Sequence, residues 1–564
     1  MGSLSTIRAA LCAAVWLAGY AVANSQTAAP TYTADVEPIL RRQCIGCHRE
    51  GDVAPFSLDT YDAVRQRGRA IADATARRYM PPWKPVAGVG GPFAGARTLT
   101  SDEIATIAKW VDGGMPRGDG GAPPVPAERL PEWRLGQPDL VVTFDQPYTL
   151  GADGPDVFRN FAIPLPVDAL KYVAAVDFSP AGARAIHHAN LRFDPSTTSR
   201  ELDAEDNDPG YEGAVSMNAR YPDGYFLGWT PGQSPLTSAP GMAWRLGPKT
   251  DLVVQLHLRR TGKPEEIRPK VAFYFTAEAP TRAPLALRLG KQNIDIKPGE
   301  QYLIADAYQL PVDAELLAIH PHAHYRAKEI RATADLPDGT RRWLLSIDDW
   351  DFNWQDVYRF AEPVALPKGT TIRMLYTYDN SDKNPRNPDR PPRHVVFGQN
   401  STDEMGDLWL QVVTATEADR TALFNGIRPK TLIEDANGYE MLVKANPDHA
   451  GYHNDLAFVS ALLGRVDAAL EHYESAARLK PDWAAPHYNV ATLLATQRRY
   501  EEALPYFRKA VALRPEHAES HNNLGAVLQV LGQSEEAIAH LRRAVALDPK
   551  NEQAKANLEK LERK

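Results

Sequence analysis

The chain has 564 residues, 43% of them hydrophobic, and a formal net charge of -8 with acidic and basic residues interspersed. This length exceeds what a single hydrophobic core accommodates, so several domains are expected. The modest negative charge argues against nucleic acid as the main partner.

Residues 1–23 have the pattern of a secretory signal peptide. Arg8 provides the positive charge, residues 9–19 the apolar run and residues 21–23 a small-residue cleavage site. We therefore expect a periplasmic or secreted protein with no membrane span after signal cleavage. The alternative is an uncleaved anchor, for which the apolar run is short.

Residues 27–117 are expected to form an α-helical domain that carries haem c. Cys44-Ile-Gly-Cys47-His48 is the pattern of covalent haem attachment, in which two thiols anchor the porphyrin and the histidine binds iron. The domain resembles single-haem cytochromes c. The chain has only three cysteines, which leaves no disulfide framework for an exported protein.

The sixth iron ligand has two candidates. Met80 is favoured because the prolines that follow it stiffen its loop, and Met115 is the rival. Trp83 is expected to cover the haem edge. Residues 118–134 are rich in Gly and Pro and predict a mobile linker, so that the haem domain is tethered and docks transiently.

Residues 135–284 and 285–425 consist of short alternating segments separated by turn residues, which indicates two antiparallel β-sandwich domains. Each contains a candidate copper site. In the first, His187, His188 and His257 offer three imidazoles. The alternative reading is a polar histidine pair at a strand end and an ordinary strand face.

In the second β-domain, His320, His322 and His324 alternate on an extended segment and so share a face. Met405 adds a thioether, and a mixed nitrogen and sulfur set suits a copper ion that passes through Cu(I). The role of His320 as a third ligand stays open, and His394 is more typical of a nearby loop residue. Met405 alone is also compatible with core packing.

The order of His187-His188, Gln255-x-His257, His322-x-His324 and Asp403-Glu404-Met405 resembles the copper type II, ascorbate-dependent monooxygenases, over residues 135 to 420. The resemblance implies two jelly-roll domains that face each other across solvent. It implies an electron-transfer copper at His187, His188 and His257. It also implies a catalytic copper at His322, His324 and Met405, where O2 and substrate react.

The resemblance also predicts what the substrate is not. In the peptide-amidating members of the family, an arginine, an asparagine and a tyrosine hold the substrate carboxylate. This chain has His320, Asp407 and Trp409 at those places, and Asp407 would repel a carboxylate. We therefore expect a small substrate other than a peptidylglycine.

Residues 437–564 contain a repeat of 34 residues, with Pro481, Pro515 and Pro549 at equivalent positions. This is the tetratricopeptide period, and it predicts an α-helical solenoid. His453, His487 and His521 recur with the same period and are therefore repeat positions, not metal ligands. The array is expected to bind a protein partner, or to stabilise the chain by docking on the other domains.

Together these features predict an oxidoreductase that hydroxylates a C–H bond with O2 at copper. Its electrons would come from, or pass through, the covalent haem, fed by a small reductant or an upstream donor. The alternative is a non-catalytic haem and copper electron-transfer or copper-binding protein that assembles partners through its repeats.

Overall fold

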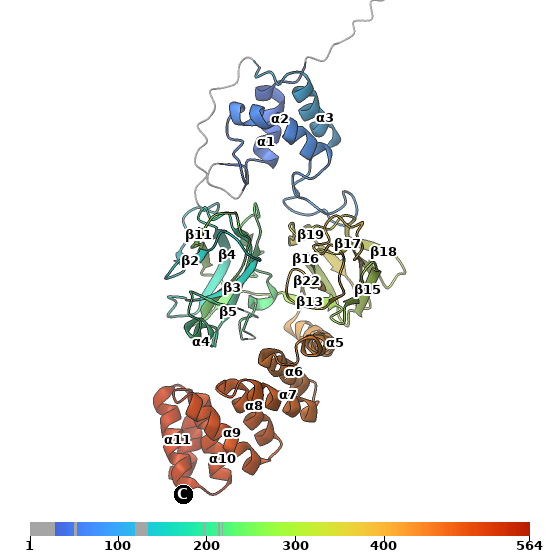
Figure 1. Ribbon diagram of the computed structural model, residues 1–564. Coiled ribbons are helices and arrows are strands. Elements are labelled where there is room, and N and C mark those ends of the chain that lie inside the picture. The colour runs from blue at the N-terminus through green and yellow to red at the C-terminus, as the bar shows by residue number, and fades with distance from the viewer. Residues whose placement is uncertain are drawn as a thin grey trace, which may run out of the picture.

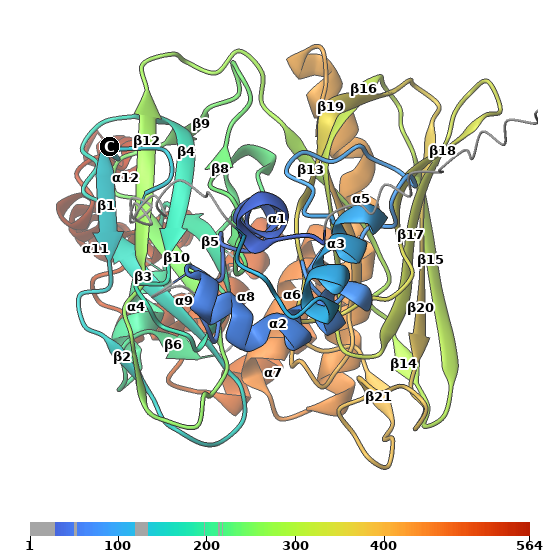
Figure 2. The ribbon, with the colours of Figure 1, turned by 90° about the horizontal axis from the view of Figure 1, so that it is seen from above.

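The computed structural model describes residues 29–49, 54–118, 133–196, 198–212, 215–216 and 218–563 (Figure 1). The expected signal peptide and nearly all of the expected linker lie outside these residues. The described chain forms a helical module, two β-rich lobes and a C-terminal helical array. The two lobes lie side by side, with the helical module on one side of them and the array on the other (Figures 1 and 2).

The N-terminal module consists of a short π-helix and three α-helices: η1 (Tyr32–Val36), α1 (Glu37–Gln43), α2 (Tyr61–Ala76) and α3 (Ser101–Asp112). α3 begins at a capping box, in which the Thr100 hydroxyl accepts from the Glu103 amide and the Glu103 carboxylate accepts from the Thr100 amide. Leu40, Val64 and Trp110 are fully buried in the core that joins these helices.

The first lobe contains twelve strands, one α-helix and one 3-10 helix among the described residues: β1 (Leu140–Thr143), β2 (Tyr148–Leu150), β3 (Val157–Pro164), β4 (Lys171–Ser179), β5 (Ile186–Asp194), α4 (Thr198–Glu205), β6 (Tyr211–Glu212), η2 (Pro222–Gly224), β7 (Gly228–Trp229), β8 (Leu236–Thr237), β9 (Trp244–Leu246), β10 (Asp251–Leu258), β11 (Glu265–Ile267) and β12 (Lys270–Thr276). One antiparallel sheet has the order β1-β12-β4-β8, with β9 also paired to β4, and the other has the order β6-β3-β10-β5-β7. Apolar side chains of both sheets form one core.

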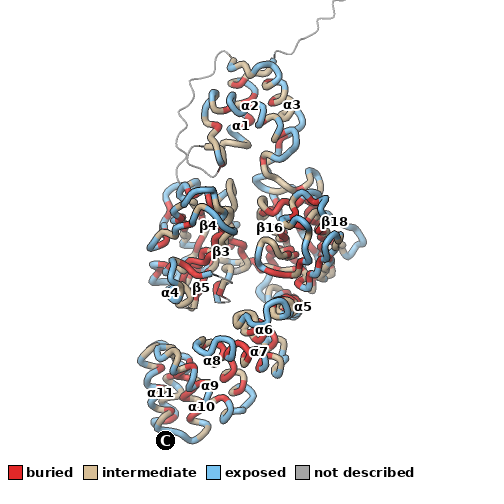
Figure 3. Tube along the Cα trace, in the orientation of Figure 1, coloured by how far each residue is buried: buried red, intermediate tan, exposed pale blue. Residues whose placement is uncertain are grey.

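The second lobe contains ten strands among the described residues: β13 (Leu285–Gly290), β14 (Asp295–Ile296), β15 (Gln301–Gln309), β16 (Ala314–Ala323), β17 (Ala327–Asp335), β18 (Arg341–Ile347), β19 (Tyr358–Leu366), β20 (Thr371–Asp379), β21 (Val395–Val396) and β22 (Gly406–Val413). Its two main antiparallel sheets have the orders β13-β22-β16-β19 and β15-β20-β17-β18. Buried residues concentrate in the strands of both lobes (Figure 3).

The C-terminal region is helical: α5 (Glu417–Ala445), α6 (Ala450–Leu462), α7 (Val466–Leu479), α8 (Ala484–Thr496), α9 (Tyr500–Leu513), α10 (Ala518–Val530), α11 (Ser534–Leu547) and α12 (Glu552–Glu562). α5 extends across the interval between the expected end of the second β-domain at 425 and the expected start of the repeats at 437. Lys291 pairs with Glu434, and Lys430 pairs with Asp306, both at 2.6 Å, so that α5 is fixed to the second lobe. None of the described helices is both long and apolar enough to cross a membrane.

The N-terminal module is anchored on the second lobe by the loop of residues 83–97. Isolated bridges pair Gly90 with Leu345 and Phe93 with Phe360. Trp83 packs edge-on against Tyr358, at 5.3 Å between ring centroids, and is a partly buried residue packed against the core of this lobe. The module is therefore docked on the second lobe by backbone pairing and by aromatic packing.

Candidate metal centres

The first histidine cluster lies on two neighbouring strands of the first lobe. His188 of β5 is directly opposite His257 of β10, and His187 precedes it. Adjacent residues of a regular strand point to opposite faces. The pairing shifts here, so that Leu258 is opposite Ile186 and His187 is the additional residue of a β-bulge. The bulge lets both neighbouring imidazoles turn toward His257.

The Nδ1 atoms of the three histidines converge. His187 Nδ1 lies 3.2 Å from His188 Nδ1 and 3.1 Å from His257 Nδ1, and the third distance is 3.4 Å. Nitrogens that bind one ion tetrahedrally at about 2.0–2.1 Å lie about 3.3 Å apart. The three imidazoles therefore have the spacing of a ligand set for a single metal ion, and their ligand atoms all lie within 4.8 Å of one another.

The protonation of this cluster also suits a metal. Burial, together with the neighbouring His257, lowers the pKa of His187 to about 3, and burial lowers that of His188 well below its usual value. His257 Nε2 lies 2.8 Å from the Asp156 carboxylate. Because an ionised carboxylate only accepts, Nε2 carries the proton and the Nδ1 lone pair points to the centre. Burial acts to raise the pKa of Asp156, but the hydrogen bond and charge of His257 outweigh it and lower that pKa.

The second cluster is assembled by the pairing of β16 with β22. His322 lies opposite Asp407, and the register ends at Ala323 opposite Gly406. His324 and Met405 are the next residues on the two strands and are therefore brought together. The His322 and His324 rings are nearly perpendicular, with centroids 5.2 Å apart. The residues that carry the two imidazoles and the thioether are thus neighbours at one strand end.

Backbone and side-chain carbonyls orient these imidazoles. His322 Nδ1 lies 2.6 Å from the Gln355 carbonyl oxygen, and His324 Nδ1 lies 3.2 Å from the Asp403 carbonyl oxygen. Carbonyls only accept, so each Nδ1 is protonated and each Nε2 is left to bind a metal. Burial lowers the pKa of both histidines, which keeps the rings neutral.

Glu404 stabilises the backbone at this end of the strand through hydrogen bonds. Its fully buried carboxylate accepts from the amides of His324 at 3.0 Å and Arg326 at 2.7 Å. Burial raises the pKa of Glu404 to about 8, against the opposing hydrogen bond and charge of Arg326. Tyr378 donates to the Met405 carbonyl at 2.9 Å. The residues around Met405 are thus fixed by buried polar contacts.

The two histidines whose roles were open have separate places. His320 Nδ1 hydrogen-bonds the Asp356 carbonyl at 3.1 Å, and its ring lies 6.1 Å from that of Phe226. His394 is exposed and hydrogen-bonds Asp295 at 2.5 Å. His320 therefore lines the same cavity as the second cluster, whereas His394 does not.

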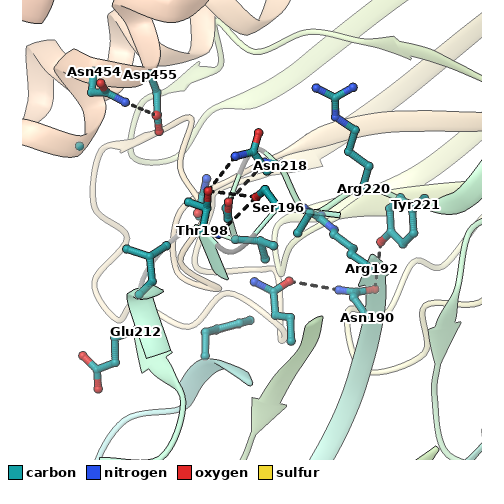
Figure 4. A pocket seen from close by; sticks show the side chains of 18 of the residues that line it. Asn190, Arg192, Ser196, Thr198, Glu212, Asn218, Arg220, Tyr221, Asn454 and Asp455 are labelled. Carbon is teal, nitrogen blue, oxygen red and sulfur yellow. Dashed lines mark hydrogen bonds between the residues drawn. The ribbon is translucent and has the colours of Figure 1, made fainter. Parts of the chain in front are cut away.

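A cavity of about 2230 Å³ contains part of each cluster. It is lined by His188 and by the second-cluster residues His322, His324 and Met405, and it continues to helices α6, α8 and α10. In Figure 4, Asn190, Arg192 and Tyr221 of the first lobe lie on one side of it and Asn454 and Asp455 of α6 on another. The ion pair between Glu201 of α4 and Arg514, the residue after α9, joins the array to the first lobe.

His320, Asp407 and Trp409, which replace the carboxylate-binding residues of the peptide-amidating enzymes, also line the cavity. Asp407 is buried beside Arg288, at 3.8 Å, and burial raises its pKa to about 6 against the charge of that arginine. The Arg288 guanidinium lies 5.6 Å from the Trp409 ring centroid and also pairs with Asp435. Arg288 is therefore already engaged by two carboxylates.

The candidate haem site lies at the end of α1. The Cys47 and His48 amides both donate to the Cys44 carbonyl, at 3.1 and 3.0 Å, which places the motif on a single turn. Neither Cys44 nor Cys47 is in a disulfide. Burial raises the pKa of the Cys44 thiol to about 12 and lowers that of His48. His48 Nδ1 lies 3.1 Å from the Phe56 carbonyl, which leaves Nε2 for iron.

The two candidate methionines differ in their packing. Met115 belongs to the module's hydrophobic cluster, and its sulfur lies so close to Gly68 of α2 that a side chain there would collide with it. Tyr61 donates to the Met115 carbonyl at 2.8 Å. Met80 follows α2, is half-buried and donates its amide to the Ala74 carbonyl at 3.2 Å. The packing thus engages the sulfur of Met115 within the helical core.

Several residues that the sequence did not single out shape these sites. Asp156, Phe352 and Gln355 contact the histidines, and Arg97 of the N-terminal module donates to Asp356 at 2.9 Å. The acidic and aromatic composition of residues 349–356, between two strands, was the one available signal. No sequence signal indicated Asp156, because it lies 101 residues from His257 along the chain.

The comparisons with known proteins identify the repeat family of the C-terminal region. Residues 448–516 and 482–550 match the profile of the tetratricopeptide repeat family, which agrees with the paired helices α6 to α11. The C-terminal helices are therefore tetratricopeptide repeats, as the 34-residue period predicts. None of the curated proteins matches the chain.

Among solved structures, the chain is similar to MamA, with 18% identity, 27% of this chain and 85% of that chain covered, and a TM-score of 0.22. It is similar to the first TPR of Spaghetti (RPAP3) bound to an HSP90 peptide, with 23% identity, coverage of 20% and 90%, and a TM-score of 0.20. It is also similar to YrrB, a TPR protein with an unusual peptide-binding site, with 21% identity, coverage of 23% and 68%, and a TM-score of 0.22.

Proposed function

We propose that this protein is a copper-dependent monooxygenase that hydroxylates a C–H bond with O2, with electrons supplied or relayed by a covalent c-type haem. The observation that carries the proposal is the convergence of the three Nδ1 atoms of His187, His188 and His257, beside a cavity that also contains His322, His324 and Met405. One site for electron transfer and one for oxygen chemistry meet at one cavity.

The donor sets suit copper in two roles. Three neutral imidazoles bind copper without a soft ligand, whereas a thioether beside two imidazoles favours Cu(I), the form that reacts with O2. When bound, the metal at His322, His324 and Met405 would supply oxygen activation. The chain's own residues would orient the rings, through the Gln355 side-chain carbonyl and the Asp403 backbone carbonyl.

The haem would be held by Cys44, Cys47 and His48, with Met80 as the further iron ligand. The Nε2 of His48, left open by the Nδ1 contact with Phe56, and two thiols on one turn that form no disulfide fit covalent attachment. The packing of Met115 into the helical core supports Met80 in this role. The haem would store electrons close to the copper centres, replacing or relaying a small reductant or upstream donor.

The volume of the cavity indicates what size of substrate it can hold. Pockets for small molecules usually measure about 300–1,000 Å³, so the cavity of about 2230 Å³ has room for more than the small substrate that the sequence predicts. Asp407 and Arg288 are paired, which supports the prediction that a peptidylglycine is not the substrate. The repeats contribute one wall, and a protein partner bound there would adjoin the copper sites.

The proposed function also includes a location outside the cytoplasm. We propose a periplasmic or secreted protein, because residues 1–23 have the pattern of a secretory signal peptide. Covalent c-type haem and copper sites are compatible with export. Those residues lie outside the described part of the chain.

Metal analysis with copper EPR on the haem-loaded full chain tests the proposal. We expect two coppers and one haem per chain. His257→Ala and Met405→Ala should each remove or alter a different copper signal, whereas His394→Ala, an exposed histidine outside the cavity, should change neither. One copper or none, with Met405→Ala silent, would favour the non-catalytic electron-transfer protein.

A further inference from the structure

The loop between β18 and β19 contacts both histidine clusters. We name residues 350–357 the bridging loop. The Phe352 ring, only 2% exposed, lies with its centroid 6.1 Å from that of His187, 6.0 Å from that of His257 and 5.3 Å from that of His324. One side chain of the second lobe therefore touches ligands of both candidate copper sites. Its ring thus links the two clusters.

The remainder of the bridging loop orients the second cluster. Trp350 donates its indole N–H to the His324 carbonyl at 3.1 Å. Gln355 and Asp356 provide the carbonyl oxygens that lie 2.6 Å from His322 Nδ1 and 3.1 Å from His320 Nδ1. These contacts attach the loop to the alternate positions 320, 322 and 324 at the end of β16, so Phe352 has a fixed position relative to the cluster.

Polar contacts fix the bridging loop to the other parts of the chain. Arg259, which follows β10 and hence His257, donates to the side-chain Oδ1 of Asn353 at 2.9 Å. From the N-terminal module, Arg97 pairs with Asp356 at 2.9 Å. The first lobe, the second lobe and the haem-motif module thus all meet at this loop.

We propose that Phe352 is a positioning residue that holds the two copper centres at one fixed separation, because its ring contacts ligands of both clusters. This inference rests on the proposed function. Its physical basis is that electron exchange between two metal ions falls steeply with their separation, and that a buried aromatic ring resists compression and displacement.

The inference predicts a spectroscopic signature. In the full chain loaded with two Cu(II) ions, the magnetic dipolar interaction measured by pulsed EPR should give one narrow, short distance distribution. Phe352→Ala should broaden and lengthen that distribution while two coppers remain bound, because no Phe352 atom is a ligand. Phe352→Leu, which keeps an apolar side chain of similar reach, should restore the wild-type distribution. Phe424→Ala, at an exposed phenylalanine of α5, is the matched control and should leave it unchanged.

The outcomes separate the two proposals. Two coppers with the same distance distribution in the wild type and in Phe352→Ala would overturn the inference and leave the proposed function standing. A broad or long distribution in the wild type itself would do the same, even if Phe352→Ala failed to fold. A wild-type chain that bound fewer than two coppers would overturn the proposed function and the inference together.

Discussion

His257 and Asp156 form a hydrogen bond of 2.8 Å between the imidazole Nε2 and a carboxylate oxygen. His257 is fully buried, and this contact determines which ring nitrogen carries the proton. A carboxylate that accepts from a ligand histidine fixes the tautomer and strengthens the ligand. Asp156 therefore supports the first histidine cluster although it is not one of its three imidazoles.

The first prediction concerns this pair. Asp156→Asn should weaken copper binding at the first cluster by about 10–100-fold, because the charged acceptor is lost. Titration against a competing chelator, with EPR to identify the site that empties, measures the effect. The second cluster should keep its affinity. Equal affinity of the first cluster in the variant and the wild type would show that Asp156 has no supporting role.

The second prediction separates the two methionines. Met80→Ala should abolish the methionine-to-iron charge-transfer absorption of the oxidised haem. Met115→Ala should retain that absorption but lower the free energy of unfolding by about 2–5 kcal/mol, the usual cost of truncating a buried methionine, with the half-burial of Met115 favouring the lower end. Absorption spectra and thermal unfolding measure the two effects. Loss of the band in Met115→Ala alone would reverse the assignment.

The third prediction concerns the docking of the repeats. Arg514→Glu should place two carboxylates together at the contact with Glu201 and increase hydrogen exchange in α4 and at the end of α9. The charge swap Arg514→Glu with Glu201→Arg should restore protection. Both side chains are partly exposed, so the change in unfolding free energy should be only about 0–1 kcal/mol. Unchanged exchange in the single variant would mean that the array does not depend on this pair.

The fourth prediction is a pH dependence in the repeats. Burial raises the pKa of Asp455 to about 6, against a hydrogen bond from Asn454. The folded state thus favours the protonated carboxyl, and this stability is present at low pH and lost as pH rises through about 6. Asp455→Asn, which does not ionise, should raise Tm relative to the wild type at neutral pH and bring no such gain near pH 4.

The control for this experiment is Asp382→Asn at an exposed position, which should leave the pH profile of Tm unchanged. A gain from Asp455→Asn of the same size at both pH values would indicate that removal of a buried charge is not its cause.

Much of the architecture could be read from local pattern. The period of 34 residues predicted the tetratricopeptide helices, and alternating segments predicted the β-rich middle of the chain, because both patterns repeat the periodicity of the backbone itself. The convergence of the His187 and His188 side chains was harder to predict from the sequence. Regular alternation places neighbours on opposite faces, and only the bulge at His257, set by the pairing of two strands distant in sequence, turns both inward.

The sequence by itself determined the chemical inventory of this protein: a Cys-x-x-Cys-His motif, two groups of histidines with one methionine, and an array of helical repeats. The tertiary structure alone decided that Trp83 packs against the second lobe, that Asp156 orients His257, and that Phe352 contacts both clusters. The reason is physical. Local patterns report backbone periodicity and burial, whereas contacts between distant segments depend on how whole sheets and loops pack, which no short window of sequence specifies.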